Sequence, residues 1–318
     1  MQKGGSSMID NIGLRVSNFG IGEYTAAMQK LNIEIPQNAS IMTTNWGNMR
    51  IKYYPLSEVL TLKNSIHKLY NGFAGSGEFI NSNDFTFSNA LTTKEMIIDV
   101  FERDASDFKI YSTFEWGVNV ETKVDPSSIF YRYLSYSAKS ISSDFYAVSY
   151  GKGKDIQREV GMQEWRIKFY DKSKQEGITN KKIIRYELVV HQLRKLTRIL
   201  GIKDLSLETV MQIPMWMKLK DELLRVYDSI KKLPLITGKE VISIDDYVKA
   251  SSFCNSMLNR DIKAIYGGNA GLRFKRECKS IYERLVKSEE NLHNLVRCSM
   301  EQAFLRLLVQ EMSSLHHL

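Results

Sequence analysis

The sequence predicts an α+β protein in which a mostly antiparallel sheet is followed by a helical C-terminal region. Apolar and polar residues alternate with a two-residue period in several segments before residue 191, which is typical of strands that bury one face. From Gln192 onward the period becomes helical, as the spacing of Leu193, Leu196 and Leu200 indicates. The change of period therefore predicts a sheet first and helices after it.

The first half of the chain is expected to supply strands and one helix. Residues 8–60 hold alternating segments, such as 49–54, between turns rich in Asn and Pro. A helix is expected over 88–106, with Ser88 as its N-cap, and a strand over 108–121. After a stretch without a clear pattern, a further strand is expected just before the basic turn at 151–154.

The second half begins with two strands, at 165–172 and 185–190, and is helical afterwards. The expected helices are 206–231, 244–266 and 272–313. Pro and Gly residues between the first two helices indicate a boundary near 232–240. The expected organisation is a flexible leader, a domain with the central antiparallel sheet, and a helical region for DNA binding or assembly, at 1–7, 8–232 and 240–318.

Composition and charge favour a protein that binds polyanions. The 44 Lys and Arg residues outnumber the 36 Asp and Glu residues by 8, a balance that suits a partner such as DNA. The 3 cysteines are too few for a disulfide framework or a zinc ribbon and are expected to be reduced thiols. No apolar run approaches the ~20 residues that span a bilayer. We therefore expect a cytoplasmic protein without a membrane partner.

The strand at 165–172 carries the residue types of a phosphoryl-transfer site on one face. Trp165, Ile167 and Phe169 alternate into the core. The opposite face places a tyrosine among cations: Arg166, Lys168, Tyr170 and Lys172. A phenol with a pKa near ~10 is a poor nucleophile unless cations or a metal stabilise the phenolate. Tyr170 is therefore a candidate nucleophile for phosphodiester transfer.

Two other strands contribute acidic side chains to the same surface. Alternation places Arg185, Glu187 and His191 on one face of the 184–191 segment, and Glu115 on the polar face of the 113–120 segment. Two carboxylates can hold one Mg²⁺ or Mn²⁺ ion that polarises a scissile phosphate, and His191 is a candidate third ligand. The simpler alternative is a half-buried sheet whose charged outer face is only solvated.

Several segments, taken in order, resemble the rolling-circle replication initiators of the filamentous-phage gene II and staphylococcal-plasmid type. They span about residues 8–230 and comprise Met8–Arg15, Ser65–Gly72, Lys109–Glu115, Ser149–Lys154, Arg166–Lys172 and Arg185–Glu187. The resemblance implies a metal-dependent nickase and strand transferase that cuts one strand at an origin by transesterification. The products would be a 5′-phosphotyrosine and a free 3′-hydroxyl for rolling-circle replication.

The same resemblance assigns roles to individual residues. It makes Tyr170 the nucleophile, flanked by Arg166 and Lys172, and it makes Glu187 an acidic site residue. Tyr111 stands where the family has a metal-binding aspartate, so that Glu115 would have to take its place. The implied partners are single-stranded or supercoiled origin DNA, a host helicase and a host polymerase, and a homodimer is left open.

Basic residues outside the tyrosine strand are candidate DNA contacts. Helices on either side of Gly267-Gly268-Asn269 would form a reader similar to a helix-turn-helix. The candidates are Lys168 on the tyrosine strand, Lys68 in the Ser65–Gly72 segment, Lys152 and Lys154 in the basic turn, and Arg273, Lys275, Arg276 and Lys279 in the last third. A solvated basic helix and a plain hairpin turn are the alternatives.

Two other functions are consistent with the sequence. An initiator fold that had lost its metal would bind an origin without nicking it. His191, Arg194 and Tyr227 echo the His-x-x-Arg pair and late tyrosine of tyrosine recombinases, although Tyr227 falls in an apolar helical segment where a packing role is natural.

Overall fold

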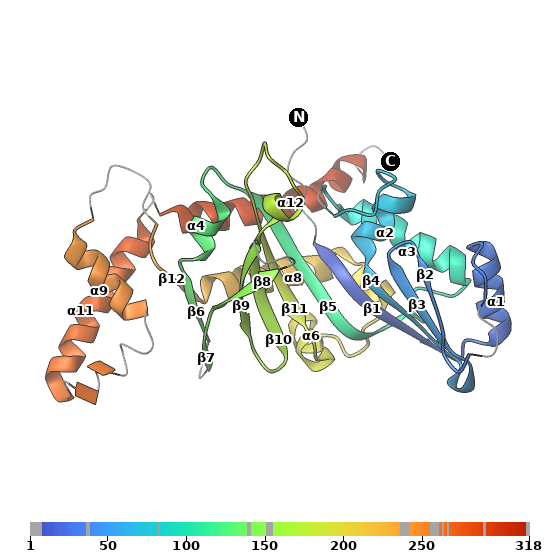
Figure 1. The fold of residues 1–318 in the computed structure, drawn as a ribbon, viewed down its shortest axis with the longest axis horizontal. Coiled ribbons are helices and arrows are strands. Elements are labelled where there is room, and N and C mark those ends of the chain that lie inside the picture. The colour runs from blue at the N-terminus through green and yellow to red at the C-terminus, as the bar shows by residue number, and fades with distance from the viewer. Residues whose placement is uncertain are drawn as a thin grey trace.

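The computed structural model describes residues 8–35, 39–81, 83–138, 141–150, 155–235, 242–254, 261–262, 264–265, 267–288 and 291–315. The protein is α+β, as predicted, with a large antiparallel sheet and C-terminal helices (Figure 1). The strands of the large sheet, in pairing order, are β2 (Met42–Trp46), β3 (Met49–Tyr54), β4 (Val59–Ser65), β1 (Ile9–Ser17), β5 (Lys109–Glu121), β11 (Ile183–Val190), β10 (Trp165–Asp171), β9 (Asp155–Gly161) and β8 (Tyr146–Tyr150).

A small sheet and the helices complete the fold. The small sheet contains β12 (Ile230–Lys232), β6 (Tyr133–Ala138) and β7 (Ile141–Asp144). The helices are α1 (Ile21–Lys30), the 3₁₀ turn η1 (Pro55–Ser57), α2 (Ile66–Phe73), α3 (Phe87–Phe101), α4 (Pro126–Phe130), α5 (Lys172–Gln175), α6 (Leu193–Leu200), α7 (Leu207–Val210), α8 (Ile213–Asp228), α9 (Ile244–Cys254), α11 (Gly268–Lys287) and α12 (Leu292–Leu315). None of the helices, over the residues that the structure describes, is long and apolar enough to cross a membrane.

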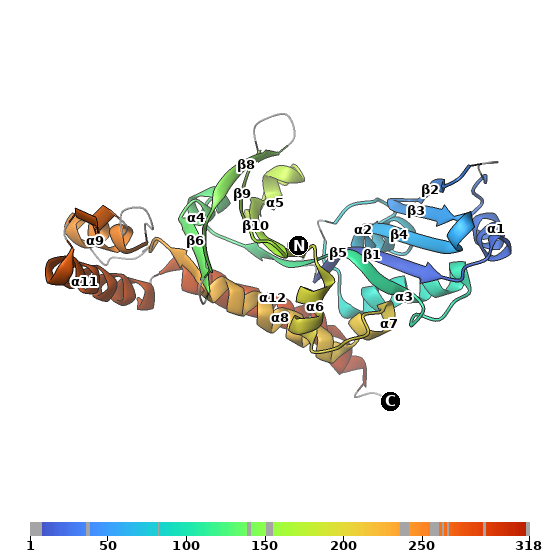
Figure 2. The same ribbon diagram turned by 90° about the horizontal axis from the view of Figure 1, so that it is seen from below.

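The apolar face of the large sheet packs against helices, which leaves its polar face for the site. Indole Nε1 of Trp116 on β5 donates to Leu219 O of α8 over 3.0 Å, and Oη of Tyr186 on β11 donates to Leu223 O over 3.1 Å. The Phe169 ring of β10 stacks on Tyr186 with centroids 4.5 Å apart. Figure 2 shows α8 and α12 running along this side of the sheet. The core therefore lies between the sheet and these helices.

The predicted single helix over 272–313 is wrong, because α11 ends at Lys287 and α12 begins at Leu292. Asn291 lies between them, and its side-chain oxygen accepts from the backbone N–H of His293 over 3.2 Å. After this break α12 returns to the sheet, where Met300 and Phe304 join the main core. By contrast, α9 and α11 pack together at one end of the molecule (Figure 1).

Three further element boundaries differ from the sequence expectation. Strand β10 stops at Asp171, whose carboxylate accepts from the Lys174 N–H over 3.0 Å and so caps α5. Lys172 is therefore helical and not on the strand with Tyr170. Helix α3 is capped by Thr86, not Ser88, and ends before Glu102. The predicted helix 206–231 is divided into α7, α8 and β12.

A β-bulge in β1 turns two successive residues toward the polar face. Ile9 pairs with Trp116 of β5, and Ile12 pairs with Phe114. Asp10 and Asn11 consequently oppose the single residue Glu115, which is the two-against-one count of a bulge. Both side chains reach the pocket described below, although strict alternation would send one of them to the core.

The close packing of the strands behind the site can be tested at Gly117 of β5. It pairs with Glu187, and a Cβ at this position would lie 2.3 Å from Tyr186 O and 2.8 Å from Glu187 Cγ. Gly117→Ala is expected to lower the free energy of unfolding by about 1–3 kcal/mol, because the two strands must move apart. Gly22→Ala on α1 is the control. Gly22 is exposed and a Cβ there would have no atom within 4 Å, so this change should not lower the free energy of unfolding. Equal urea midpoints for the two variants would contradict the packing.

Candidate active site

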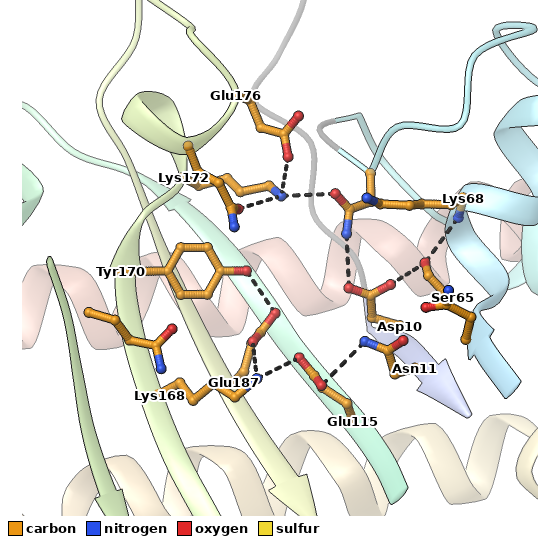
Figure 3. A pocket seen from close by; sticks show the side chains of 14 residues that line it. Asp10, Asn11, Ser65, Lys68, Glu115, Lys168, Tyr170, Lys172, Glu176 and Glu187 are labelled. Atoms are coloured by element: carbon orange, nitrogen blue, oxygen red, sulfur yellow. Dashed lines mark hydrogen bonds and ion pairs between the residues drawn. The ribbon is translucent and has the colours of Figure 1, made fainter. Parts of the chain in front are cut away.

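A pocket of about 240 Å³ opens on the polar face of the sheet. All 14 residues that line it are polar or charged, and β1, β5, β10, β11 and α2 contribute several of them (Figure 3). The lining residues are Asp10, Asn11, Asn64, Ser65, Lys68, Asn81, Glu115, Gln157, Lys168, Tyr170, Lys172, Gln175, Glu176 and Glu187. Such a lining suits a charged ligand and not an apolar one.

Three carboxylates meet in this pocket. Asp10, Glu115 and Glu187 come from β1, β5 and β11, and their ligand oxygens lie within 4.8 Å of one another. Their exposed fractions are only 3%, 7% and 1%. Buried like charges at this separation are unfavourable unless cations compensate them. The arrangement is therefore either a structural charge network or a functional site.

Lys168 and Arg185 provide the compensating charge. Lys168 Nζ lies 3.1 Å from Glu115 and 3.4 Å from Glu187, and Arg185 Nε lies 2.7 Å from Glu187. Arg185 Nη2 also lies 3.7 Å from Asp10. Burial alone would raise the pKa of Glu187, but the charges of Lys168 and Arg185 outweigh it and hold that pKa well below its usual range. Burial and the Glu187 charge raise the pKa of Glu115.

Tyr170 is tied directly to this network. Its hydroxyl donates to Glu187 Oε1 over 3.0 Å (Figure 3), and the same oxygen accepts from Arg185 Nε. Burial raises the pKa of the Tyr170 phenol well above its ordinary value, and the neighbouring Glu187 charge adds to the effect. The phenol is thus protonated at neutral pH, with a carboxylate in position to accept its proton.

A second group of polar contacts joins Asp10 to Lys172. Asp10 accepts from the Ser65 hydroxyl and, over 2.9 Å, from Asn81 Nδ2. The Asn81 side-chain oxygen in turn accepts from Lys172 Nζ over 2.9 Å. Lys172 also donates to Glu176 over 2.7 Å, and burial lowers the pKa of its ammonium. The predicted site residue Lys172 is therefore in the pocket although it is not on the strand.

Sequence reasoning missed Asp10, Ser65 and Asn81. An acidic residue between Ile9 and Ile12, on a strand that is buried along most of its length, was an available signal for Asp10, since an unpaired buried carboxylate is costly. Ser65 is the N-cap of α2, where its hydroxyl accepts from the Lys68 N–H over 3.1 Å. Asn81 lies in a segment without regular secondary structure, and nothing in the sequence marks it.

Arg166 and His191 lie beside each other, outside the pocket that holds the three clustered carboxylates. Arg166 Nε donates to His191 Nε2 over 3.2 Å, and Arg166 Nη1 lies 3.6 Å from Glu159. Burial lowers the pKa of His191, and the Arg166 charge lowers it further. Asp10, and not His191, is the third potential metal ligand that lies beside Glu115 and Glu187.

The other predicted residues are distributed over the molecule. Tyr111 is 37% exposed on β5 and does not line the pocket, whereas Asp10 lies there with Glu115 and Glu187. Lys68 lines the pocket, and Lys168 is held between the carboxylates, below the outer surface. Lys152 and Lys154 lie outside the described residues. The basic residues of α11 are exposed, far along the molecule from the pocket (Figure 1): Arg273, Lys275, Arg276 and Lys279.

The residues of the recombinase alternative do not come together. Tyr227 is buried in α8, where its hydroxyl lies 3.1 Å from the Tyr133 hydroxyl and donates to His293 O over 3.3 Å. Burial raises the pKa of this phenol well above its ordinary value. Arg194 of α6 forms an ion pair with Glu164, which lies in the turn between β9 and β10, and not with Tyr227. Tyr227 is a packing residue.

The donor set of the pocket fits a divalent cation. Three carboxylates converge from three adjacent strands, and oxygen ligands of this kind are those that Mg²⁺ and Mn²⁺ prefer. Asp10, Glu115 and Glu187 would hold such an ion, and its charge would offset their mutual repulsion. Fold and site together define an α+β protein whose open antiparallel sheet carries a tyrosine next to a carboxylate cluster.

Comparison with known proteins adds little to this description. No protein-family model and no curated protein sequence matches the chain. Among solved structures it is similar to a rolling-circle replication initiator protein from Geobacillus stearothermophilus. The match has 10% sequence identity and a TM-score of 0.38, and it covers 75% of this chain and 90% of the other. A likeness this weak does not determine function.

Mn²⁺ binding tests the carboxylate cluster directly. Glu187→Gln is expected to weaken Mn²⁺ binding by at least on the order of tenfold, because it removes a charged ligand. Glu121→Gln is the matched control, since Glu121 is an exposed acid on β5. Isothermal titration calorimetry checks both variants. Wild-type affinity in Glu187→Gln would show that the cluster is a structural charge network.

Proposed function

We propose that the protein is a replication initiator of the rolling-circle type, which nicks one DNA strand at an origin through Tyr170. The observation that supports it best is the hydroxyl of Tyr170 at 3.0 Å from Glu187, inside a group of three buried carboxylates. A nucleophile, an acceptor for its proton and ligands for a metal are thereby adjacent. The ordered sequence resemblance to such initiators points to the same residues.

The proposed reaction is a transesterification. Tyr170 Oη attacks a phosphodiester, the new bond joins Oη to phosphorus, and the bond from phosphorus to the 3′ oxygen breaks. The phenolic proton leaves along its hydrogen bond to Glu187 and passes on to solvent, because the low pKa of that carboxyl does not let it keep the proton. The 3′ oxygen takes a proton from solvent. The products are a 5′-phosphotyrosine and a free 3′-hydroxyl that a host polymerase can extend.

The cations of the site have distinct roles in this proposal. Arg185 holds the Glu187 carboxylate in place through its 2.7 Å contact and adds positive charge near the attacking oxygen. Lys172, which lines the pocket with Tyr170, would stabilise charge on the phosphate, whereas Arg166 lies outside the pocket beside His191 and Glu159. A bound Mg²⁺ or Mn²⁺ would supply Lewis-acid polarisation of the scissile phosphate.

The proposed partner is origin DNA in single-stranded or supercoiled form, with a host helicase and polymerase acting after the nick. The exposed cations of α11 would contact phosphates and position the protein, since such contacts carry no sequence information themselves. Arg284 of α11 is paired with Asp246 of α9 over 2.6 Å, so it braces the two helices.

One observation favours a second candidate, a non-catalytic origin-binding protein. Lys168 lies between Glu115 and Glu187, and Arg185 pairs with Glu187 and Asp10, so two cations already compensate the carboxylates without a metal. A chain that had kept the initiator fold for binding alone would retain such a network. This candidate predicts tight, salt-sensitive DNA binding and no covalent product at any divalent-ion concentration.

A covalent-adduct assay separates the two candidates. The protein is incubated with Mn²⁺ and labelled single-stranded DNA from its own replicon, and the product is resolved under denaturing conditions. Wild type should give a protein–DNA band, and Tyr170→Phe should lower its yield by at least on the order of 10³-fold, since the nucleophile is lost. Tyr131→Phe, at an exposed tyrosine on the end of α4, is the control. Binding without any band in wild type would favour the non-catalytic protein.

A further inference from the structure

The polar face of the large sheet continues beyond the pocket as a group of exposed cations. Arg50 and Lys52 lie on β3, Lys63 lies on β4, and Arg15 lies on β1. Arg15, Arg50 and Lys63 are exposed, and Lys52 is partly exposed. Among the residues that the structure describes, no carboxylate forms an ion pair with any of these four. We call these four residues the basic strip.

Sheet register relates the basic strip to the pocket. Ser65 and Asn11, which line the pocket, pair with each other across β4 and β1. The next row on the same face pairs Lys63 with Arg50, and the row after it contains Arg15 and Lys52 on either side of Thr61. Rows of one face are separated by about 7 Å along a strand. Lys63 and Arg50 therefore lie one row away from the pocket residues Ser65 and Asn11, and Arg15 and Lys52 lie two rows away.

The opposite, apolar face of these strands is the one that the helices cover. Met49, Ile51 and Tyr53 of β3 are buried, and the Tyr53 ring stacks on Tyr24 of α1 with centroids 4.6 Å apart. Because side chains alternate along a strand, Arg50 and Lys52 project from the other side. Figure 2 shows β1, β3 and β4 side by side, close to α1 and α3. The strip thus has the apolar core behind it and solvent in front.

Two exposed aromatic rings lie at the end of α2, over the turn between β2 and β3. Phe73 and Phe79 are 52% and 41% exposed, and their centroids are 5.5 Å apart at an interplanar angle of 76°. Gly72 lies beneath Phe79, since a Cβ there would be 2.1 Å from that ring. Gly72 is four residues after the pocket residue Lys68 on α2, about one helical turn away.

We propose that one strand of single-stranded DNA crosses the basic strip on its way to the Tyr170 pocket, with its phosphates on Arg50, Lys63 and Arg15 and a base against the Phe73–Phe79 pair. The identity of the ligand rests on the proposed function. Cations without a carboxylate partner among the described residues, in successive rows, suit a chain of phosphates, and exposed rings over the turn that leads into β3 suit unpaired bases. A folded acidic protein would use the cations but not the rings, and a duplex has no free base to stack.

The test removes two cations from the strip. Arg50→Gln/Lys63→Gln is compared with Lys203→Gln/Arg306→Gln, which removes the same charge from exposed positions on the α6–α7 loop and α12. Binding of a labelled single-stranded oligonucleotide is measured by fluorescence anisotropy over a series of KCl concentrations without divalent ions. Melting curves verify that each variant is folded.

The strip variant should bind on the order of tenfold more weakly at ~0.1 M salt, and its slope of log Kd against log salt should fall by about 1.4, at ~0.7 for each lost phosphate contact. The control should keep the wild-type slope. Phe73→Leu/Phe79→Leu should weaken single-stranded binding several-fold and leave duplex binding unchanged. Wild-type binding by the strip variant, or an equal loss in the control, would overturn the proposal.

The test of the DNA path and the test of the nicking function can fail independently of each other. If wild type forms the Tyr170 adduct while the strip variant binds DNA normally, the DNA path is wrong and the function stands. If wild type forms no adduct but the strip variant loses its binding, the path stands and the protein is a binder.

Discussion

The Glu187 carboxylate is the group on which the arrangement of the site depends. It is buried in β11, accepts from Tyr170 and Arg185 at one oxygen, and faces Lys168 with the other. An ionised carboxylate can stay buried only while those partners remain, because desolvation alone would protonate it. Tyr170, the cations and the other two acids are thus arranged around one charge. This mutual dependence explains why Arg185, usually a surface residue type, is only 1% exposed.

The sheet gives this network its rigidity, and its two faces have separate tasks. Tyr186 and Glu187 are neighbours on β11, yet Tyr186 packs against α8 and Phe169 while Glu187 lies in the pocket. Strand pairing fixes Gly117 opposite Glu187, and there the absence of a side chain lets the strands approach. Stability is concentrated behind the sheet, and the chemistry and the proposed DNA path lie in front of it.

The alternation of the strands was enough to predict much of the site. It placed Tyr170, Lys168, Glu187 and Glu115 on one surface, because each lies in a regular part of its strand. It could not place Asp10, since the bulge in β1 breaks the alternation and depends on pairing with β5, distant in sequence. The separation of α11 from α12 was also missed, because the apolar spacing continues across the break.

Mapping the covalent product by mass spectrometry would test the central claim most directly. After reaction with single-stranded origin DNA and Mn²⁺, nuclease and trypsin digestion should leave a nucleotide 5′-phosphate on the tryptic peptide Phe169–Lys172, which contains Tyr170 as its single tyrosine. This modified peptide is the expected product, with no adduct on any other tyrosine. A nucleotide on a different tyrosine, or an unmodified Tyr170 in a preparation that nicks DNA, would contradict it.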